Sequence, residues 1–134
     1  MNATILLIED NEQNRYLATF LLERRGYRVV AAADGPQGIE VAEALKPDLI
    51  LLDIQLPAMD GYAVARALRS IDVLREVPII AVTSYAMVGD REKSLAAGCN
   101  GYIEKPINPD SFVAEIEQIR ADALVRQGAP QCES

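Results

Sequence analysis

Residues 49–61 read LILLDIQLPAMDG, and the first four of them are all large and aliphatic. A run of Leu and Ile with no polar alternation is typical of a β-strand that is buried on both faces. Asp53 follows this run directly, and Asp60 stands where the N-cap of a following helix is expected. The segment therefore predicts a central strand with a carboxylate at its end, followed by a loop and a new helix.

Similar apolar runs recur along the chain, and the segments between them have a helical hydrophobic period. A strand followed by a helix, repeated five times, predicts a parallel sheet with helices on both faces and right-handed crossovers. We therefore expect an α/β fold of the flavodoxin-like (βα)5 type, with a doubly wound five-stranded sheet of order 2-1-3-4-5. The expected strands are residues 5–8, 29–33, 49–52, 79–82 and 102–103.

The helices are predicted from apolar residues at spacings of three and four. N-caps are expected at Asn11, Asp34 and Asp60, and left-handed glycines at Gly26 and Gly98. The fourth helix, residues 89–97, has the weakest apolar face, which predicts low local stability. We expect one domain over residues 1–125, followed by a flexible tail over 126–134. The apolar positions are Leu17, Phe20 and Leu21; Ile39, Ala42 and Leu45; Val64, Ala67 and Leu68; and Phe112, Ile116, Ile119 and Ala123.

The composition excludes several classes of function. The 134 residues carry 13 Lys and Arg against 20 Asp and Glu, a net charge of −7, so we expect no nucleic acid or anionic lipid as partner. No apolar run reaches the roughly 20 residues of a membrane helix. The chain has no histidine, and its two cysteines are too few for a disulfide framework. We therefore expect a soluble, cytoplasmic protein.

Polar residues stand at the ends of the predicted strands, where ligands bind in a doubly wound sheet. Glu9 and Asp10 follow the first strand, Asp53 the third, Thr83 ends the fourth and Lys105 follows the fifth. Crowded carboxylates repel each other unless a cation sits among them, and carboxylates with water are the usual ligands of Mg²⁺. An aspartate beside such a metal can accept a phosphoryl group. The sequence thus predicts a magnesium-dependent phosphoacceptor site.

These residues carry a resemblance to a known family. From Thr4 to about Val125 the chain resembles the receiver domain of two-component response regulators. Within that family it is most similar to single-domain regulators of the polar-differentiation type and to receivers attached to hybrid kinases. The matching pieces are Glu9-Asp10-Asn11, the segment from Asp53 to Gly61, Thr83-Ser84-Tyr85-Ala86, and Gly101-Tyr102-Ile103-Glu104-Lys105-Pro106.

The resemblance implies a role for each matching residue. Asp53 would be the phosphoacceptor, and Thr83 and Lys105 would contact the phosphoryl group. Asp10, Asp53 and the backbone carbonyl of Gln55 would bind Mg²⁺, with Glu9 holding a metal-bound water. Tyr102 would move together with Thr83 as a switch, and the peptide bond between Lys105 and Pro106 would be cis.

The function expected from this resemblance is signalling rather than turnover of a separate substrate. A sensor histidine kinase or a histidine phosphotransfer protein would supply the phosphoryl group, and the domain would catalyse its own phosphorylation and dephosphorylation. Phosphorylation would then change a protein-binding surface made by the fourth helix, the fifth strand and the fifth helix. The alternative is a phosphorelay intermediate that passes the phosphoryl group to a histidine phosphotransfer protein.

Two other classes of protein, an enzyme and a cofactor carrier, fit the sequence poorly. A magnesium phosphatase of the haloacid-dehalogenase kind needs a second aspartate two residues after the nucleophile, where this chain has Gln55. A flavin or nucleotide carrier needs a Gly-, Ser- or Thr-rich loop after the first strand. The acidic loop Glu9-Asp10-Asn11-Glu12 would instead repel a phosphate unless a metal ion lies between them.

Overall fold

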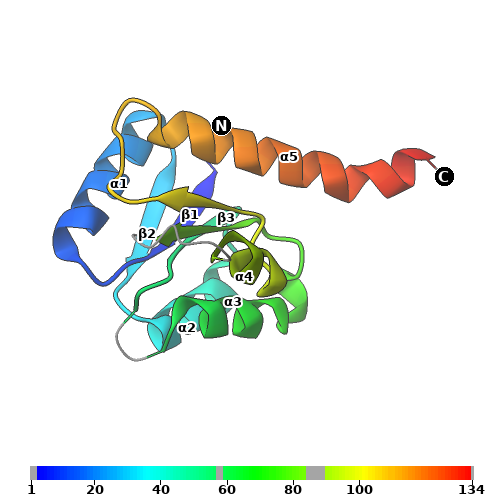
Figure 1. The fold of residues 1–134 in the computed structure, drawn as a ribbon, viewed down its shortest axis with the longest axis horizontal. Coiled ribbons are helices and arrows are strands. Elements are labelled where there is room, and N and C mark those ends of the chain that lie inside the picture. Colours follow the sequence, from blue (N-terminus) through cyan, green and yellow to red (C-terminus); the bar gives the residue numbers. More distant parts are fainter. Residues whose placement is uncertain (1–2, 57–58, 84–89, 134) are drawn as a thin grey trace.

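The computed structural model describes residues 3–56, 59–83 and 90–133, and in residues 90–91 and 126–133 only the backbone (Figure 1). Five strands alternate with five α-helices, and a short 3-10 helix precedes the fourth strand. The elements are β1 (Thr4–Ile8), α1 (Glu12–Arg24), β2 (Arg28–Ala32), α2 (Gly35–Leu45), β3 (Leu49–Asp53), α3 (Gly61–Arg69), η1 (Asp72–Leu74), β4 (Ile79–Thr83), α4 (Asp90–Ala96), β5 (Gly101–Glu104) and α5 (Phe112–Glu133).

The strands form one parallel sheet of order β2-β1-β3-β4-β5, which confirms the predicted topology. The register pairs Ile8 with Leu52, and Asp53 with Val82. Consequently β1 and β3 end side by side at the centre of the sheet. This is the point where the strand order reverses, and any polar residue following either strand emerges there.

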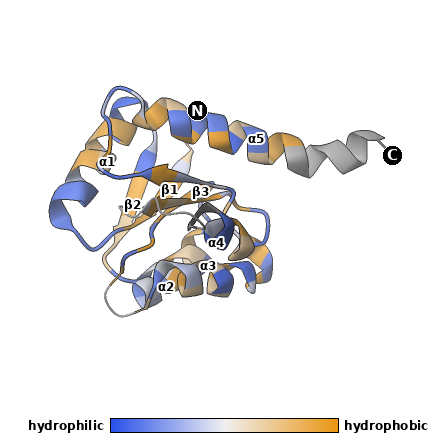
Figure 2. Cartoon of the chain, in the orientation of Figure 1, coloured by the Kyte–Doolittle hydropathy of each residue, from blue (hydrophilic) through white to orange (hydrophobic). Residues whose placement is uncertain are grey.

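Two hydrophobic clusters cover the two faces of the sheet. Leu49 and Leu51 belong to the cluster beneath α1 and α5, whereas Ile50 and Leu52 belong to the cluster on the side of α2 and α3 (Figure 1). The strands are predominantly hydrophobic, whereas the helices carry both hydrophobic and hydrophilic residues (Figure 2). The unbroken apolar run of β3 is therefore explained by burial on both sides.

The predicted helix boundaries are confirmed at the caps. The side chains of Asn11, Asp34 and Asp60 each accept a hydrogen bond from the backbone N–H three residues later, at 2.8–2.9 Å. Gly26 and Gly98 have φ angles of +94° and +108°, in the region where a side chain would be strained. These local signals act within a few residues, which is why they could be read without knowing the fold.

Several strand and helix ends differ by one residue from the sequence prediction: β1 begins at Thr4, β3 and β4 extend to Asp53 and Thr83, and α4 covers Asp90–Ala96. β2 begins and ends one residue earlier than expected, at Arg28 and Ala32, and β5 extends over Gly101–Glu104. The carboxyl-terminal segment 126–133 continues α5 to Glu133, although the sequence there shows no apolar period. Flexibility of that segment stays a prediction. None of the helices described combines the length and apolar composition that crossing a bilayer requires.

The predicted buried face of α1 was wrong at one position. Phe20 is 47% exposed, whereas Ala18 and Leu22 are the residues that α1 buries against the sheet. The apolar residues 17, 18, 21 and 22 lie on one side of the helix, where 18 and 22 are buried and 17 and 21 are half-buried. Phe20 lies outside this side of the helix. Spacing alone could not select which of the possible apolar faces would be centred on the sheet.

Arg69, the last residue of α3, joins several loops at one end of the molecule. Its guanidinium donates hydrogen bonds to the carbonyls of Leu74, Val77 and Gly98 at 2.7–2.9 Å. It also donates to Asn100 Oδ1 at 2.9 Å. Burial lowers the pKa of Arg69, but an arginine stays charged in proteins. The group therefore stabilises the loops before β4 and β5 through charge-assisted hydrogen bonds.

Replacing Arg69 with methionine should lower the free energy of unfolding by about 3 kcal/mol, because several buried carbonyls lose their donor at once. Urea denaturation followed by circular dichroism would measure the change. Arg66, an exposed arginine on the same helix, is the matched control, and Arg66→Met should change stability by less than about 0.5 kcal/mol. Equal effects of the two substitutions would contradict a special role for Arg69.

Candidate functional site

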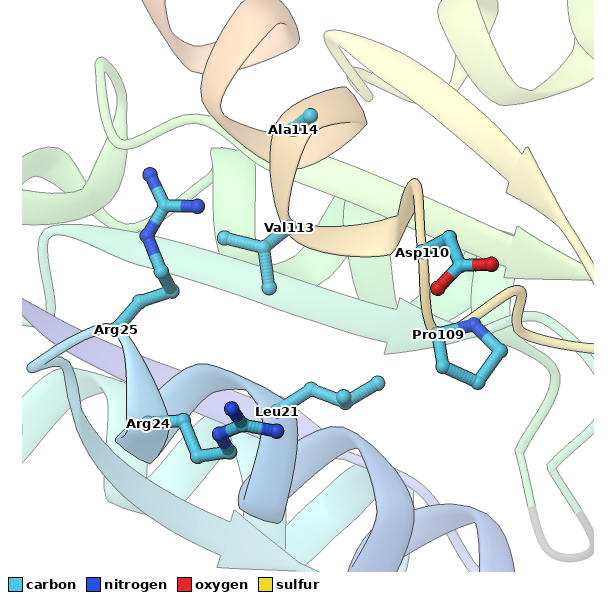
Figure 3. Close-up of a pocket in the computed structure, with 7 residues that line it drawn as sticks. All are labelled: Leu21, Arg24, Arg25, Pro109, Asp110, Val113 and Ala114. Atoms are coloured by element: carbon cyan, nitrogen blue, oxygen red, sulfur yellow. The ribbon is translucent and has the colours of Figure 1, made fainter.

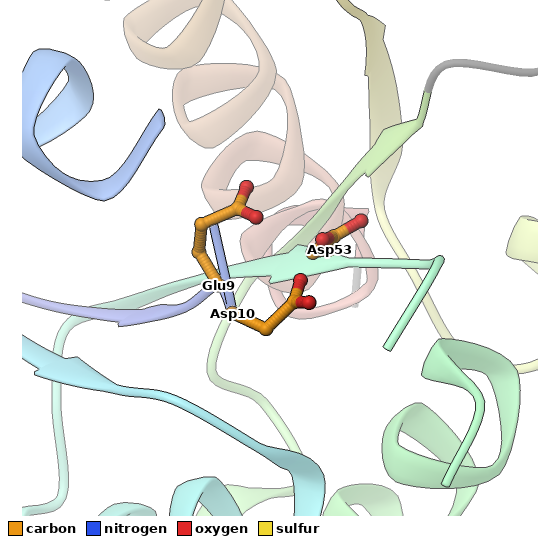
Figure 4. Close-up of side chains that lie close together, drawn as sticks. All are labelled: Glu9, Asp10 and Asp53. Atoms are coloured by element: carbon orange, nitrogen blue, oxygen red, sulfur yellow. The ribbon is translucent and has the colours of Figure 1, made fainter. Parts of the chain in front are cut away.

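The residues that the sequence singled out come together at the carboxyl edge of the sheet. Glu9 and Asp10 follow β1, Asp53 is the last residue of β3 and Thr83 the last of β4, and Lys105 follows β5. Carboxylate oxygens of Glu9, Asp10 and Asp53 all lie within 4.8 Å of one another (Figure 4). Glu9 and Asp53 are buried, whereas Asp10 is exposed. The site is thus open to solvent on the Asp10 side.

Lys105 supplies positive charge to this acidic cluster. Its Nζ lies 3.1 Å from Glu9 Oε1 and 3.2 Å from Asp53 Oδ2, and only 12% of its side chain is exposed. The peptide bond between Lys105 and Pro106 is cis, as the resemblance implied. One ammonium therefore faces two buried carboxylates, and the third carboxylate, on Asp10, has no described ion pair.

Glu9 carries the largest electrostatic penalty in the site. Burial, and next the adjacent Asp53 carboxylate, raise the pKa of Glu9 to about 7 from an ordinary value of 4.5. The backbone N–H of Asn11, which donates to Glu9 Oε2 at 3.1 Å, and the Lys105 ammonium oppose this rise. Glu9 therefore gains or loses a proton close to neutral pH.

Hydrogen bonds hold the loops that carry the carboxylates. Arg15 of α1 donates from Nη1 to the carbonyl of Glu9 at 3.0 Å and to that of Asp10 at 3.3 Å. After β3, the backbone N–H of Gln55 donates to Asp53 Oδ1 at 2.9 Å. Both loops are thereby fixed relative to the strand ends from which they emerge.

The Gln55 side chain makes a contact that the sequence did not predict. Its Nε2 donates to Thr83 Oγ1 at 2.7 Å, and Thr83 is only 1% exposed. The resemblance implied that the backbone carbonyl of Gln55 binds Mg²⁺, and it did not indicate a contact between the Gln55 side chain and Thr83. The contact joins the loop after β3 to the end of β4, and no spacing in the sequence indicates it because the two residues are 28 positions apart.

Tyr102 lies on the same face of the sheet as Thr83. Tyr102 pairs with Ala81 in the register of β4 and β5, and alternate residues of a strand share a face, so Thr83 and Tyr102 are diagonal neighbours. Tyr102 is partly buried against the cluster beside α2 and α3. This placement puts the two proposed switch residues on adjacent strands. Pro57 and Ala58, and the segment 84–86 that contains Tyr85, lie outside the described residues.

The donor atoms at this edge fit a magnesium ion. Mg²⁺ prefers oxygen ligands, takes one or two protein carboxylates and keeps several waters. The cluster offers three carboxylates with no nitrogen or sulfur donor among them, and its exposed Asp10 leaves room for water. The chemistry of the residues present therefore agrees with the metal that the resemblance implied.

A hollow elsewhere on the surface is separate from this edge. About 310 Å³ in volume, it lies between α1 and the start of α5 (Figure 3). None of its lining residues belongs to the acidic cluster, so the candidate site is the carboxyl edge of the sheet rather than this hollow. The lining residues are Leu21, Arg24, Arg25, Pro109, Asp110, Val113 and Ala114.

Comparisons with known proteins agree with this geometry. Residues 5–117 match the response regulator receiver domain, and the chain belongs to this family. It is 41% identical over 123 residues to the polar-differentiation response regulator DivK of Brucella anthropi, covering 92% of this chain and all of DivK.

Solved structures of receiver domains superpose closely on the chain. The receiver domain of a sensor histidine kinase from Pseudomonas aeruginosa, solved with a magnesium ion coordinated in the active-site cleft, is 40% identical with a TM-score of 0.82. The match covers 90% of this chain and 99% of that domain. The chemotaxis protein CheY4 of Vibrio cholerae gives a TM-score of 0.85 at 26% identity, over 89% of this chain and 99% of CheY4.

The raised pKa of Glu9 predicts a pH-dependent stability. Between about pH 4.5 and pH 7 the folded chain binds more protons than the unfolded chain, so the free energy of unfolding should fall as the pH rises through this range. In EDTA, which removes divalent cations, the free energy of unfolding should fall by about 3 kcal/mol over this range. Urea denaturation between pH 5 and pH 8 would measure it.

Glu9→Gln removes the titrating group and should flatten this part of the pH profile, leaving the variant the more stable protein at pH 8. Glu43→Gln, on the exposed surface of α2, is the control and should keep the native profile. An unchanged profile in Glu9→Gln would show that another group is responsible.

Proposed function

We propose that this receiver domain works as a single-domain response regulator that accepts a phosphoryl group on Asp53. The central observation is that the buried Asp53 carboxylate lies beside two further carboxylates and the Lys105 ammonium at the open edge of the sheet. The match to DivK along the full length of that protein supports a regulator of this kind. The donor would be a sensor histidine kinase or a histidine phosphotransfer protein.

The transfer itself is a nucleophilic substitution at phosphorus. A carboxylate oxygen of Asp53 forms the new P–O bond, the P–N bond of a phosphohistidine donor breaks, and the released imidazole takes up a proton. The product is an acyl phosphate on Asp53. Since the chain contains no histidine, the phosphohistidine must be supplied by another protein.

A magnesium ion would be held by Asp10, Asp53 and the backbone carbonyl of Gln55, with Glu9 holding a metal-bound water. Bound there, it would neutralise charge on the phosphoryl oxygens. The magnesium site of the Pseudomonas aeruginosa receiver supports this assignment. We also propose that the domain catalyses its own phosphorylation and dephosphorylation, with no separate substrate.

Lys105 and Thr83 would bind the transferred group. The Lys105 ammonium, now 3.2 Å from Asp53 Oδ2, would pair with a phosphoryl oxygen, and the Thr83 hydroxyl would donate to another. Drawing Thr83 toward the phosphoryl group would leave space that Tyr102 fills from β5. The signal would then leave through α4, β5 and α5 toward a downstream protein.

A second candidate is a relay that passes the phosphoryl group onward to a histidine phosphotransfer protein. The 40% identity to a receiver of a sensor histidine kinase favours it. The two candidates share the same chemistry at Asp53 and differ in the final acceptor. In either role we propose a cytoplasmic protein without nucleic acid or membrane partners, in keeping with the net charge of −7.

Acetyl phosphate with Mg²⁺ should add one phosphoryl group, on Asp53 alone, because the Asp53 carboxylate ends the central strand β3 and lies beside both the acidic cluster and the Lys105 ammonium. Intact-mass spectrometry would detect it. The added mass should be absent in Asp53→Asn and in EDTA, and Asp48→Asn, an exposed control, should label normally. Normal labelling of Asp53→Asn would move the acceptor to another residue.

Thr83→Ala should still be phosphorylated but should lose most of the response of Tyr102, because a phosphoryl group can shift a conformational equilibrium only through contacts that differ between the two states. Amide chemical shifts with and without beryllofluoride would measure the response along α4 and β5. Thr83→Ser, which keeps the hydroxyl, is the control. Native-like shifts in Thr83→Ala would contradict the proposed coupling.

A further inference from the structure

The outer face of α1 combines exposed aromatic rings with charges. Tyr16 is 74% exposed and Phe20 47%, and their rings stack with centroids 6.4 Å apart and planes at 14°. The Arg24 guanidinium lies over Phe20, 5.6 Å from its ring centre. Glu12, one turn before Tyr16, is also exposed. The four residues form a row at spacings of four, which we call the α1 row.

The α1 row points away from the sheet. At about 100° per residue, Tyr16 and Phe20 lie on either side of the direction opposite Ala18, one of the two residues that α1 buries. Neither Glu12 nor Arg24 forms an ion pair within the described part of the chain. The row is therefore a solvent-facing surface with two aromatic rings between a carboxylate and a guanidinium, neither of which has an ion pair among the described residues.

The α1 row is also complementary to itself. It has a carboxylate at its amino end, a guanidinium at its carboxyl end and the two rings between them. If a second copy lies antiparallel, with a two-fold axis between Tyr16 and Phe20, Glu12 of each copy meets Arg24 of the other. Tyr16 of each copy likewise meets Phe20 of the other. In a two-fold interface the same surface is used on both copies and each contact occurs twice, so the α1 row alone can form both sides of the interface.

We propose that the α1 row is a self-association surface on which two copies of this chain pair antiparallel. Aromatic rings at the centre with opposite charges at the rim is the usual composition of protein interfaces. The charge pairs set the antiparallel direction, since a parallel pairing would place like charges together. A single pair of helices buries less area than a standard interface, so the dimer is weak, with a Kd of about 100 µM.

Sedimentation velocity of the full chain, from about 10 µM to about 1 mM and with a reductant to exclude disulfides, tests this surface. The native chain should shift from monomer to dimer across this range. Glu12→Arg and Arg24→Glu should each weaken association at least tenfold, because each places two like-charged pairs in the dimer. Phe20→Ala should weaken it to a similar extent.

An equimolar mixture of Glu12→Arg and Arg24→Glu provides the decisive result. In a mixed dimer every end pairs opposite charges again, so the mixture should associate about as strongly as the native chain. Glu43→Arg, a reversal on the exposed surface of α2, should leave association unchanged. Circular dichroism would verify that each variant is folded.

Three outcomes would overturn the proposal. The first is a native chain that remains monomeric at 1 mM under these conditions. The second is a dimer that tolerates both charge reversals and Phe20→Ala, because it must then use another face. The third is a mixture of the two reversal variants that remains monomeric, which would exclude the antiparallel pairing of Glu12 with Arg24.

Discussion

The crowding of negative charge at the carboxyl edge of the sheet is the constraint on which the site depends. Glu9 and Asp53 are buried within reach of each other, and the single ammonium of Lys105 contacts both. Burial, and next the adjacent Asp53 carboxylate, raise the pKa of Glu9 to about 7, and the Lys105 ammonium opposes this rise only in part. This arrangement of charge agrees with the magnesium ion and the phosphoryl group that we propose for this edge.

The rest of the fold serves to hold these groups in place. The sheet is buried on both faces, so the strand ends that carry Asp53 and Thr83 cannot move far without disturbing two hydrophobic clusters. Around this rigid centre, hydrogen bonds from Arg15 and from the Gln55 side chain fix the loops that follow β1 and β3. At the opposite edge, Arg69 holds the loops that precede β4 and β5.

The two helices on one face of the sheet differ in how they use their outer surfaces. α1 buries only Ala18 and Leu22 fully and presents the α1 row to solvent. α5 packs on the same cluster and is joined to the end of α1 by the Arg25–Glu117 ion pair at 3.0 Å. A phosphorylation signal that leaves through α4, β5 and α5 would therefore reach a surface other than the α1 row, on which we propose that two copies of the chain pair.

The sequence by itself determined the strand order, the helix caps and the set of residues at the carboxyl edge. The strands, the caps and the edge residues depend on signals that act over a few residues: apolar runs such as residues 49–52, cap residues such as Asp60, and polar residues directly after a strand. The strand order was predicted from the alternation of strands and helices repeated along the whole chain. Only the tertiary structure decided the outward position of Phe20, the hydrogen bond from Gln55 to Thr83 and the raised pKa of Glu9. These depend on packing between distant segments and on burial of charge, which no local pattern specifies.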